Sequence, residues 1–449
     1  MVVREFRRLA ALGLCASAMA AAPSIPSSPP SFYKDVLPIL QQRCQACHRS
    51  GEPAPMPLLD YAGTKPWAGT ILEAITSHEM PPWYADPSVG HFANDRSLSA
   101  ADIQTIAAWV AAGAPAGAQE DGPRPVHWVE GWSIGEPEIV FEVPSSFNVP
   151  VSGIVPYQYA IVPTHFKRDT WIRLAEVRPG DRGHVHHIVV SVREQDSSWL
   201  AGEPIGIPFT LNPHESGGGV PGEFLAGFGP GAMPELLAPG QAKLVKAGSD
   251  LVFQLHYTTD GRPGCDRSRI GLVLSHEPPH QRVLMLAAAN TRFLIPAGDP
   301  DYEVDARITL HAEATLVSLL PHMHLRGKSF EFRVVYPDGR AETLLRVPHY
   351  SYNWQLSYYL ATPLRLPAGS TIECSAHFDN SAANPVNPDP AKAVRFGPQS
   401  WDEMMIGYFE VATGLKNGLR ELLLPGETNR EVPDKGADQK QRPVWTAVR

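Results

Sequence analysis

Residues 251–257, Leu-Val-Phe-Gln-Leu-His-Tyr, carry the pattern that decides the fold of most of this chain. Large apolar side chains occupy every second position from Leu251 to Tyr257, which is the period of a β-strand with one buried face. Similar alternation appears at 157–162, 314–320 and 330–335, and a turn is expected at Pro337-Asp338-Gly339. Short strands without intervening helical segments predict antiparallel, jelly-roll-like β-sandwiches. The length predicts two of them, at 126–285 and 286–425, with the boundary signal spread over 276–298.

The segment before these strands has a helical pattern instead, so the chain is multidomain. Ser99 and Asp102 form a capping-box signature, and Gly113 followed by Pro115 ends the helix that they begin. Earlier helices are expected at 32–43 and 67–77. We therefore expect a small all-α domain at 31–113, a linker at 114–125 and, after the strands, a polar tail at 426–449.

Composition excludes several classes of protein. The 449 residues carry a net charge of −9, which argues against a nucleic-acid partner. With 45 prolines and 37 glycines the chain is not a coiled coil. Five cysteines exclude a disulfide scaffold, whereas 17 histidines direct attention to metal chemistry.

The amino terminus has the pattern of an export signal. Three arginines within residues 4–8 precede an apolar run at 9–22, which is too short to span a membrane. We expect a signal peptide at 1–20, cleaved near Ala20. Cys15 does not fit a lipoprotein site because Leu14 stands where a small residue is needed. These features predict a periplasmic or secreted protein without a membrane span.

Cys44-Gln45-Ala46-Cys47-His48 is the C-x-x-C-H pattern of covalent haem c attachment. Two thiols on one helical turn can each bond a vinyl group, and His48 then lies beneath the iron as axial ligand. The alternative is a C-x-x-C that serves as a redox pair or as half of a zinc site. A zinc site would need a second C-x-x-C, and the chain has none. The region 31–113 resembles a class I cytochrome c domain.

A second axial ligand is expected about one helix further along. Met80 is our choice, because prolines follow it and can hold a loop stiffly enough to present a thioether. Met56 and His78 are the competing candidates.

Three histidine groups and a methionine pair stand out in the β region: 184–187, 254–257, 322–324 and 402–405. His322 and His324 point to the same face of a strand and can hold one metal. Adjacent His186 and His187 need a bulge, a strand end or the use of different ring nitrogens to do so, and His184 with His186 is the rival pair. Imidazoles suit zinc, copper, iron or nickel, whereas a thioether ligand favours copper.

In sequence order, H-H, Q-x-H-Y, H-x-H and D-E-M resemble the motifs of the copper type II, ascorbate-dependent monooxygenase family, which includes peptidylglycine α-hydroxylating and dopamine β-monooxygenases. The resemblance covers most of 126–425 and implies two packed antiparallel β-sandwiches with two coppers. It assigns one copper, the electron donor, to His186, His187 and His256. It assigns the other, where dioxygen and substrate meet, to His322, His324 and Met404, and Tyr408 matches the family tyrosine.

The chain departs from the family at positions that contact substrate. Leu320 stands where the peptidylglycine enzyme has an arginine that anchors the substrate carboxylate, and Ile406 replaces an asparagine. A glycine-extended peptide is therefore not the expected substrate. Most family disulfides are absent; Cys265 and Cys374 can pair in an oxidising compartment or remain two buried free thiols.

These observations predict an enzyme that hydroxylates a C–H bond of an unidentified substrate with dioxygen. Ascorbate or a redox protein can supply the electrons, and we expect the haem of the same chain to take this role or to relay to copper. Two alternatives remain: a haem and copper electron-transfer or copper-holding protein without oxygenase activity, and a β-sandwich binding module with residual histidines.

Overall fold

The computed structural model describes residues 28–424 except 51, 53, 55, 129–130, 212–221, 230 and 236. The expected signal peptide at 1–20 and the expected tail at 426–449 lie outside the described residues. Within the described ranges, no helix combines the length and apolar character needed to cross a membrane.

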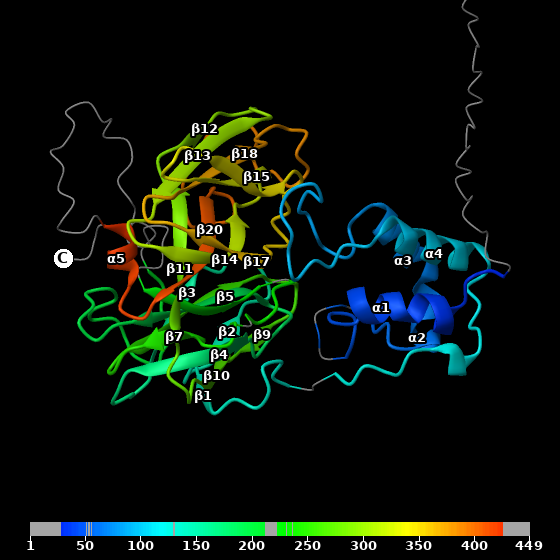
Figure 1. Ribbon diagram of the computed structural model, residues 1–449, viewed down its shortest axis with the longest axis horizontal. Helices are drawn as coiled ribbons and strands as arrows, with labels where there is room; N and C mark the ends of the chain where they lie inside the picture. The colour runs from blue at the N-terminus through cyan, green and yellow to red at the C-terminus, as the bar shows by residue number, and fades with distance from the viewer. Residues whose placement is uncertain are drawn as a thin grey trace, which may run out of the picture.

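A helical region lies beside a larger β body (Figure 1). Its helical elements are η1 (Phe32–Val36), α1 (Leu37–Arg43), α2 (Tyr61–Thr64), η2 (Lys65–Trp67), α3 (Ala68–Thr76), α4 (Ala100–Ala111) and η3 (Gln119–Asp121). The helices expected at 32–43 and 67–77 are confirmed as η1 with α1 and as α3, and both hydrogen bonds of the Ser99–Asp102 capping box are present.

The β body is mostly antiparallel sheet in two sandwiches. The first sandwich comprises β1 (Ile139–Glu142), β2 (Phe147–Val149), β3 (Gln158–Pro163), β4 (Thr170–Arg178), β5 (Val185–Arg193), β6 (Glu223–Phe228), β7 (Gln241–Val245), β8 (Asp250–Tyr257), β9 (Gly264–Asp266) and β10 (Arg269–Leu274). The second comprises β11 (Gln281–Asn290), β12 (Leu294–Ile295), β13 (Tyr302–Thr309), β14 (Ala314–His322), β15 (Gly327–Val335), β16 (Ala341–Val347), β17 (Tyr358–Leu366), β18 (Thr371–Phe378), β19 (Val394–Arg395) and β20 (Met405–Gly414), followed by α5 (Leu419–Leu423). The four segments with alternating side chains are confirmed as β8, β3, β14 and β15.

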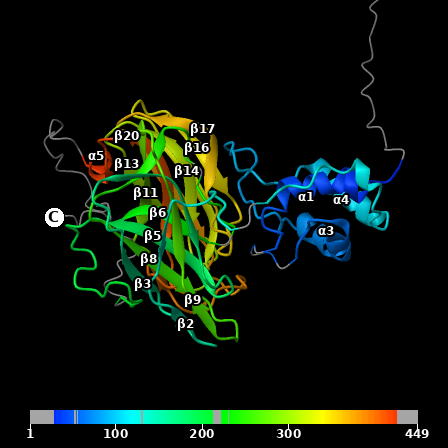
Figure 2. The same ribbon diagram turned by 90° about the horizontal axis from the view of Figure 1, so that it is seen from below.

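One sheet is shared by the two sandwiches. Its order is β1-β10-β4-β7-β11-β20-β14-β17, and each sandwich is completed by a four-stranded sheet, β3-β8-β5-β6 or β13-β18-β15-β16. Figure 2 shows β3, β8, β5 and β6 side by side. The join is a short parallel pairing in which Gln281 and Arg282 of β11 face Gln241 and Ala242 of β7. The sandwiches are therefore continuous through one sheet rather than linked only by chain.

The junction between the sandwiches differs from the expected one. The boundary placed at 285/286 falls inside β11, which pairs with β20 over its whole length, from Gln281 to Asn290. The structural junction is the connection 275–280, between β10 and β11. This connection reads Ser-His-Glu-Pro-Pro-His and lies at the start of the expected range 276–298.

Each sandwich has its own apolar core. Val190, Phe253 and Ile270 are fully buried in the first, and Phe332 and Phe409 in the second. The expectation that β8 is buried on one face is wrong, since Val252 on its other face is buried as well. Segment 199–211 covers that face and contributes Leu200 to a small second cluster.

The helical region packs around Phe32, Leu40, Ile106 and Trp109, all with no exposed surface. The expected linker begins as part of this packing. Backbone carbonyls at 115 and 116 accept hydrogen bonds from the start of η1, and the Trp109 indole donates to the carbonyl of Pro115 at 3.0 Å.

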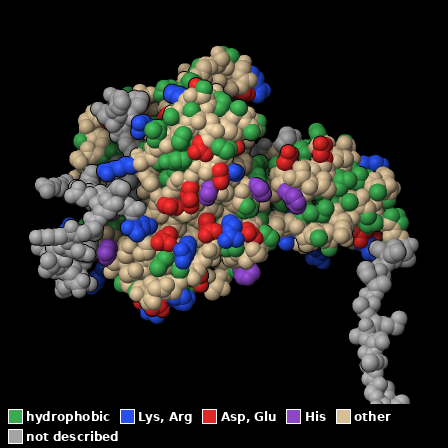
Figure 3. Space-filling view, turned by 90° about the horizontal axis from the view of Figure 1, so that it is seen from above, with side chains coloured by type: hydrophobic (Ala, Val, Ile, Leu, Met, Phe, Trp, Pro, Cys, Tyr) green, Lys and Arg blue, Asp and Glu red, His purple; other side chains and the backbone are tan. Residues whose placement is uncertain are grey.

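Residues 83–96, here called the docking arm, connect the helical region to the second sandwich. Trp83 and Phe92 pack on the Tyr358 ring, with centroids 4.8 and 5.4 Å away. Asn94 bonds the carbonyl of Ser357 at 2.7 Å and the amide of Tyr359 at 3.0 Å. In the space-filling view the helical region is a separate lobe, and acidic and basic side chains are interspersed over the β body (Figure 3).

Candidate metal centres

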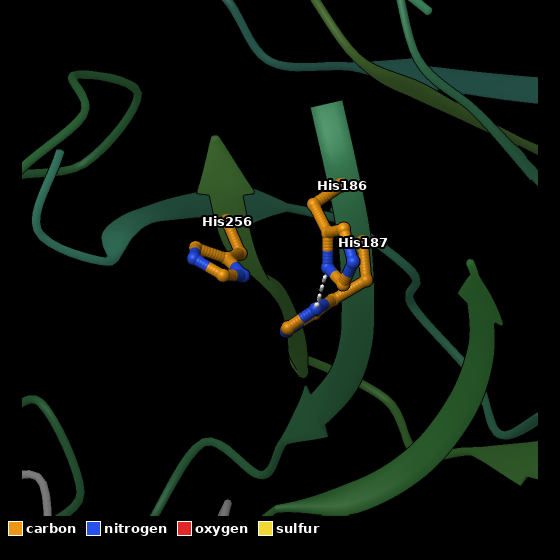
Figure 4. Close-up of side chains that lie close together, drawn as sticks. All are labelled: His186, His187 and His256. Atoms are coloured by element: carbon orange, nitrogen blue, oxygen red, sulfur yellow. Dashed lines mark hydrogen bonds between the residues drawn. The ribbon is translucent and has the colours of Figure 1, made fainter. Parts of the chain in front are cut away.

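The first cluster consists of His186 and His187 on β5 and His256 on β8 (Figure 4). Val185 lies opposite Tyr257 and His187 lies opposite His256, so His186 is an extra residue on β5 at this point. This is the β-bulge that two adjacent histidines require if both are to face one site.

The geometry of the first cluster fits a metal ion. One nitrogen of each imidazole lies within 4.8 Å of the others, and the two Nδ1 atoms of His186 and His187 are 3.2 Å apart. Two imidazoles bound to one ion at about 2.0 Å in a tetrahedral site have nitrogens about 3.3 Å apart. Nδ1 of His256 is buried and has no hydrogen-bond partner among the described residues. A bound cation would satisfy that atom.

The imidazoles of the first cluster are held neutral. Burial, with a smaller contribution from the nearby His186, lowers the pKa of His256 to about 3. Burial also lowers the pKa of His186, and burial with the neighbouring imidazoles lowers that of His187. Neutral imidazole is the form that binds metal.

His184, the rival for this site, is engaged elsewhere. Its Nδ1 lies 2.8 Å from Asp181, and its Nε2 lies 3.0 Å from Asp260 and 3.2 Å from the carbonyl of Arg262. The two carboxylates raise its pKa although burial opposes them. Both ring nitrogens are therefore used, and His184 with His186 does not form a pair.

The second cluster is formed by His322 and His324, and Met404 lines the same cavity as His322. His322 ends β14, and its ring centroid lies 5.3 Å from that of His324. Nδ1 of His322 faces Oε1 of Gln355 at 2.6 Å, and Nδ1 of His324 faces the carbonyl of Asp402 at 3.4 Å. Because oxygen acceptors hold both Nδ1–H groups, each Nε2 is left free as a ligand atom.

Glu403 holds the backbone of this cluster. Its carboxylate accepts the amide of His324 at 2.9 Å and the amide of Arg326 at 2.6 Å. Burial raises the pKa of Glu403 to about 8, although these two donors oppose the shift. The D-E-M motif thus supplies a carbonyl that orients His324, a carboxylate that fixes its loop, and the Met404 thioether.

Both clusters face one cavity of about 230 Å³ between the sandwiches. His186 and His187 line it from the first sandwich, and His322, Met404 and Tyr408 from the second. Burial raises the pKa of Tyr408 to about 12, and its ring centroid is 6.0 Å from that of His322.

Tyr352 lies between the two clusters. Its ring stacks on that of His186 at 5.2 Å and an interplanar angle of 13°, and meets the ring of His324 edge-on at 6.1 Å. One aromatic side chain therefore contacts an imidazole of each cluster.

The C-x-x-C-H pentad follows α1, with Cys44 as its C-cap and the amide of His48 bonded to the carbonyl of Cys44 at 2.9 Å. Nδ1 of His48 faces the carbonyl of Met56 at 3.2 Å, which leaves Nε2 free for an axial position. Cys44 and Cys47 are free thiols, and burial raises the pKa of both. This donor set fits covalent haem.

The candidates for the second axial ligand have different surroundings. The carbonyl of Met56 faces the His48 ring, so Met56 lies on the same side of the haem site as the first axial ligand. This position disfavours Met56 as the second axial ligand, which must approach from the opposite side. His78 is exposed, whereas Met80 is partly buried just before the docking arm.

Cys265 and Cys374 are not brought together. Cys265 is exposed on β9 of the first sandwich, and Cys374 is 1% exposed in the core of the second. Leu320 lines the cavity beside His322, where the resemblance places an arginine, and Ile406 lies opposite His322 on β20.

Several residues of the site escaped the sequence analysis. Tyr352 and Gln355 lie in the loop between β16 and β17, which contains no recognisable motif, so nothing in the sequence indicated that they belong to the site. Lys243 is the exception: a lysine within the buried strand Gln241–Val245 is an anomaly that signals a buried ion pair. Its partners are described below.

Comparisons with known proteins place the chain in no family. No protein-family model matches it, and no curated protein matches its sequence. Among solved structures, PNGF-II is 13% identical over 62% of this chain and 65% of its own, with a TM-score of 0.30. A structure of infectious bursal disease virus, Gx strain, is 10% identical over 64% of this chain and 75% of its own, with a TM-score of 0.17. Neither likeness is close enough to bear on function.

Proposed function

We propose that this chain is an exported, periplasmic or secreted monooxygenase that uses two coppers and one covalent haem to hydroxylate a C–H bond. One substrate molecule, one dioxygen, two electrons and two protons give the alcohol and one water. The observation that carries the proposal is the single cavity lined by histidines of both clusters. A closed electron-transfer site would have no need of such a space.

Copper would supply one-electron chemistry and dioxygen binding at the clusters, and haem would supply a stored electron. The residues of the chain prepare the site for these groups. Gln355 and the carbonyl of Asp402 leave the Nε2 atoms of the second cluster free. Tyr157 packs on His256 at 4.8 Å and on His187 at 5.7 Å, and so shields the first cluster from water.

Contacts between the lobes support electron supply from the haem. Glu52, four residues after His48, pairs at 3.3 Å with Arg182, which lies four residues before His186. On the other side, Asn94 bonds Ser357, two residues from the Gln355 that holds His322. The helical lobe thus touches a segment leading to each cluster, and attachment in one chain gives a high effective concentration.

The first test is metal content of the exported, haem-matured protein after copper is offered under reducing conditions. We expect about two coppers per haem, and about one in His256→Ala. His276→Ala is the matched control, because His276 is exposed and lies outside both clusters. Haem without copper would contradict the proposal and leave a cytochrome-like lobe on a binding module.

Turnover and electron transfer are tested separately. Met404→Ala should abolish substrate-dependent oxygen uptake and leave the haem spectrum unchanged. Stopped-flow mixing of reduced haem with oxidised copper should show fast haem oxidation, slowed in Asn94→Ala. Ser88→Ala is the control, because the exposed Ser88 hydrogen-bonds with Asp86 of the same arm rather than with the segment 355–359. A haem that stays reduced beside oxidised copper would refute the relay.

A further inference from the structure

The floor of the cavity is formed by three neighbouring strands, β11, β20 and β14. Their register places residues in three successive cross-strand rows: His322, Ile406 and Ala289; Leu320, Tyr408 and Ala287; and Ser318, Glu410 and Met285. Alternate residues of a strand are about 7 Å apart, so the floor extends about 14 Å from the second cluster to the Glu410 row.

The far end of this floor is closed by a buried ion triad. The Lys243 ammonium bonds Glu235 at 2.5 Å, Glu410 at 2.8 Å and the carbonyl of Leu225 at 3.1 Å. Ser318 donates to the other oxygen of Glu410 at 2.9 Å. All three protons of the ammonium are therefore engaged inside the protein, and none remains for a ligand.

The charges of the triad balance internally. Burial and the nearby Glu410 carboxylate raise the pKa of Glu235, and the two carboxylates raise the pKa of Lys243 against its burial. The triad therefore presents no unpaired positive charge to the cavity. No lysine or arginine is among the described residues that line the cavity.

The rest of the lining is largely apolar. Phe224, Phe228, Met233, Met285 and Leu320 are among its side chains. An apolar cavity of about 150 Å³ in another protein binds benzene, so about 230 Å³ suits a molecule of about ten heavy atoms.

We propose that this cavity binds a small, uncharged, largely apolar molecule along the three rows, with its reacting carbon at the His322 end. This inference rests on the proposed function and names the substrate class. At the Glu410 end of the floor, away from the histidine clusters, a carboxylate would meet another carboxylate and, among the described residues, no free lysine or arginine, so it would lose its hydration without replacement. An ammonium would have to displace Lys243 from its partners.

The test uses the full-length, haem-matured protein without copper and calorimetric titration with three probes that all stay within about ten heavy atoms: ethylbenzene, benzoate and benzylamine. We expect ethylbenzene to bind and each charged probe to bind at least about tenfold more weakly. Equal or tighter binding of either charged probe, or no binding of ethylbenzene, would overturn the inference. Because no copper is present, copper binding and substrate class can fail independently.

Two variants locate the binding. Leu320→Arg should reduce or remove the preference for the neutral probe, with benzoate gaining at least about tenfold over wild type. Thr362→Arg adds the same charge at an exposed position of β17 and should change nothing. An equal gain in both variants would place the binding outside the cavity.

Discussion

Acid should destabilise the metal-free protein through its histidine clusters. His256 and His322 have pKa values of about 3 and about 4, against 6.5 for an ordinary histidine. The unfolded chain therefore takes up protons below pH 6.5 that the folded chain does not. The stability held by each group is complete above pH 6.5 and falls as the pH drops toward the folded value. At about pH 5 the loss is about 2 kcal/mol for each histidine, or about 4 kcal/mol for the two.

The measurement is the free energy of unfolding in urea at about pH 7.5 and about pH 5, after removal of metal with a chelator. His256→Gln removes one titrating group, so it should lose about 2 kcal/mol less than wild type over this interval. His276→Gln, at an exposed position, should lose as much as wild type. If His256→Gln also lost as much as wild type, the burial argument would be refuted.

Three other predictions concern single contacts. Gln355→Leu removes the acceptor that fixes His322, so copper affinity of the second cluster should fall about 10- to 100-fold in a competition titration. Glu403→Gln replaces one accepting oxygen by an NH2 group, which would face a backbone N–H with no acceptor between them. The free energy of unfolding measured in urea should therefore fall by about 1–3 kcal/mol. Met80→Ala should alter the axial-ligand band of the ferric haem spectrum, whereas Met56→Ala should leave it in place.

Each of these predictions has a control. Gln355→Glu keeps an oxygen acceptor and should retain most of the affinity; equal losses in both variants would contradict an orienting role. Glu373→Gln changes a solvent-facing carboxylate on β18 and should be nearly neutral. A spectrum altered by Met56→Ala alone would move the axial assignment from Met80 to Met56.

Local sequence patterns predicted the elements of the fold well. The alternation at 251–257 correctly predicted β8, and the Ser99–Asp102 pair correctly predicted the start of α4. Both patterns depend only on residues that are close together in the sequence. The junction at 275–280 lies at the start of the expected range 276–298, but its exact position depends on which distant strand pairs with β11, and the sequence did not fix it. The burial of both faces of β8 was missed for the same reason: its cover comes from 199–211.

The candidate site was predictable where it rests on motifs. The motifs identified the histidines, and a bulge was one of the arrangements expected to let His186 and His187 face one site. The bulge is present. It did not reveal Tyr352, Gln355 or the partners of Lys243, because these residues reach the site from separate loops and strands. Contacts that depend on how the two sandwiches pack cannot be read from the spacing of residues in the sequence.

The short pairing of β7 with β11 has a consequence for dividing the chain. Cutting at 275–280 would leave β7 and β11 each with a bare edge, whose free amides and carbonyls would be open to pairing with a second molecule. Isolated halves should therefore self-associate or aggregate, even though each retains a core. Fragments meant to separate the two clusters are better replaced by point variants in the intact chain.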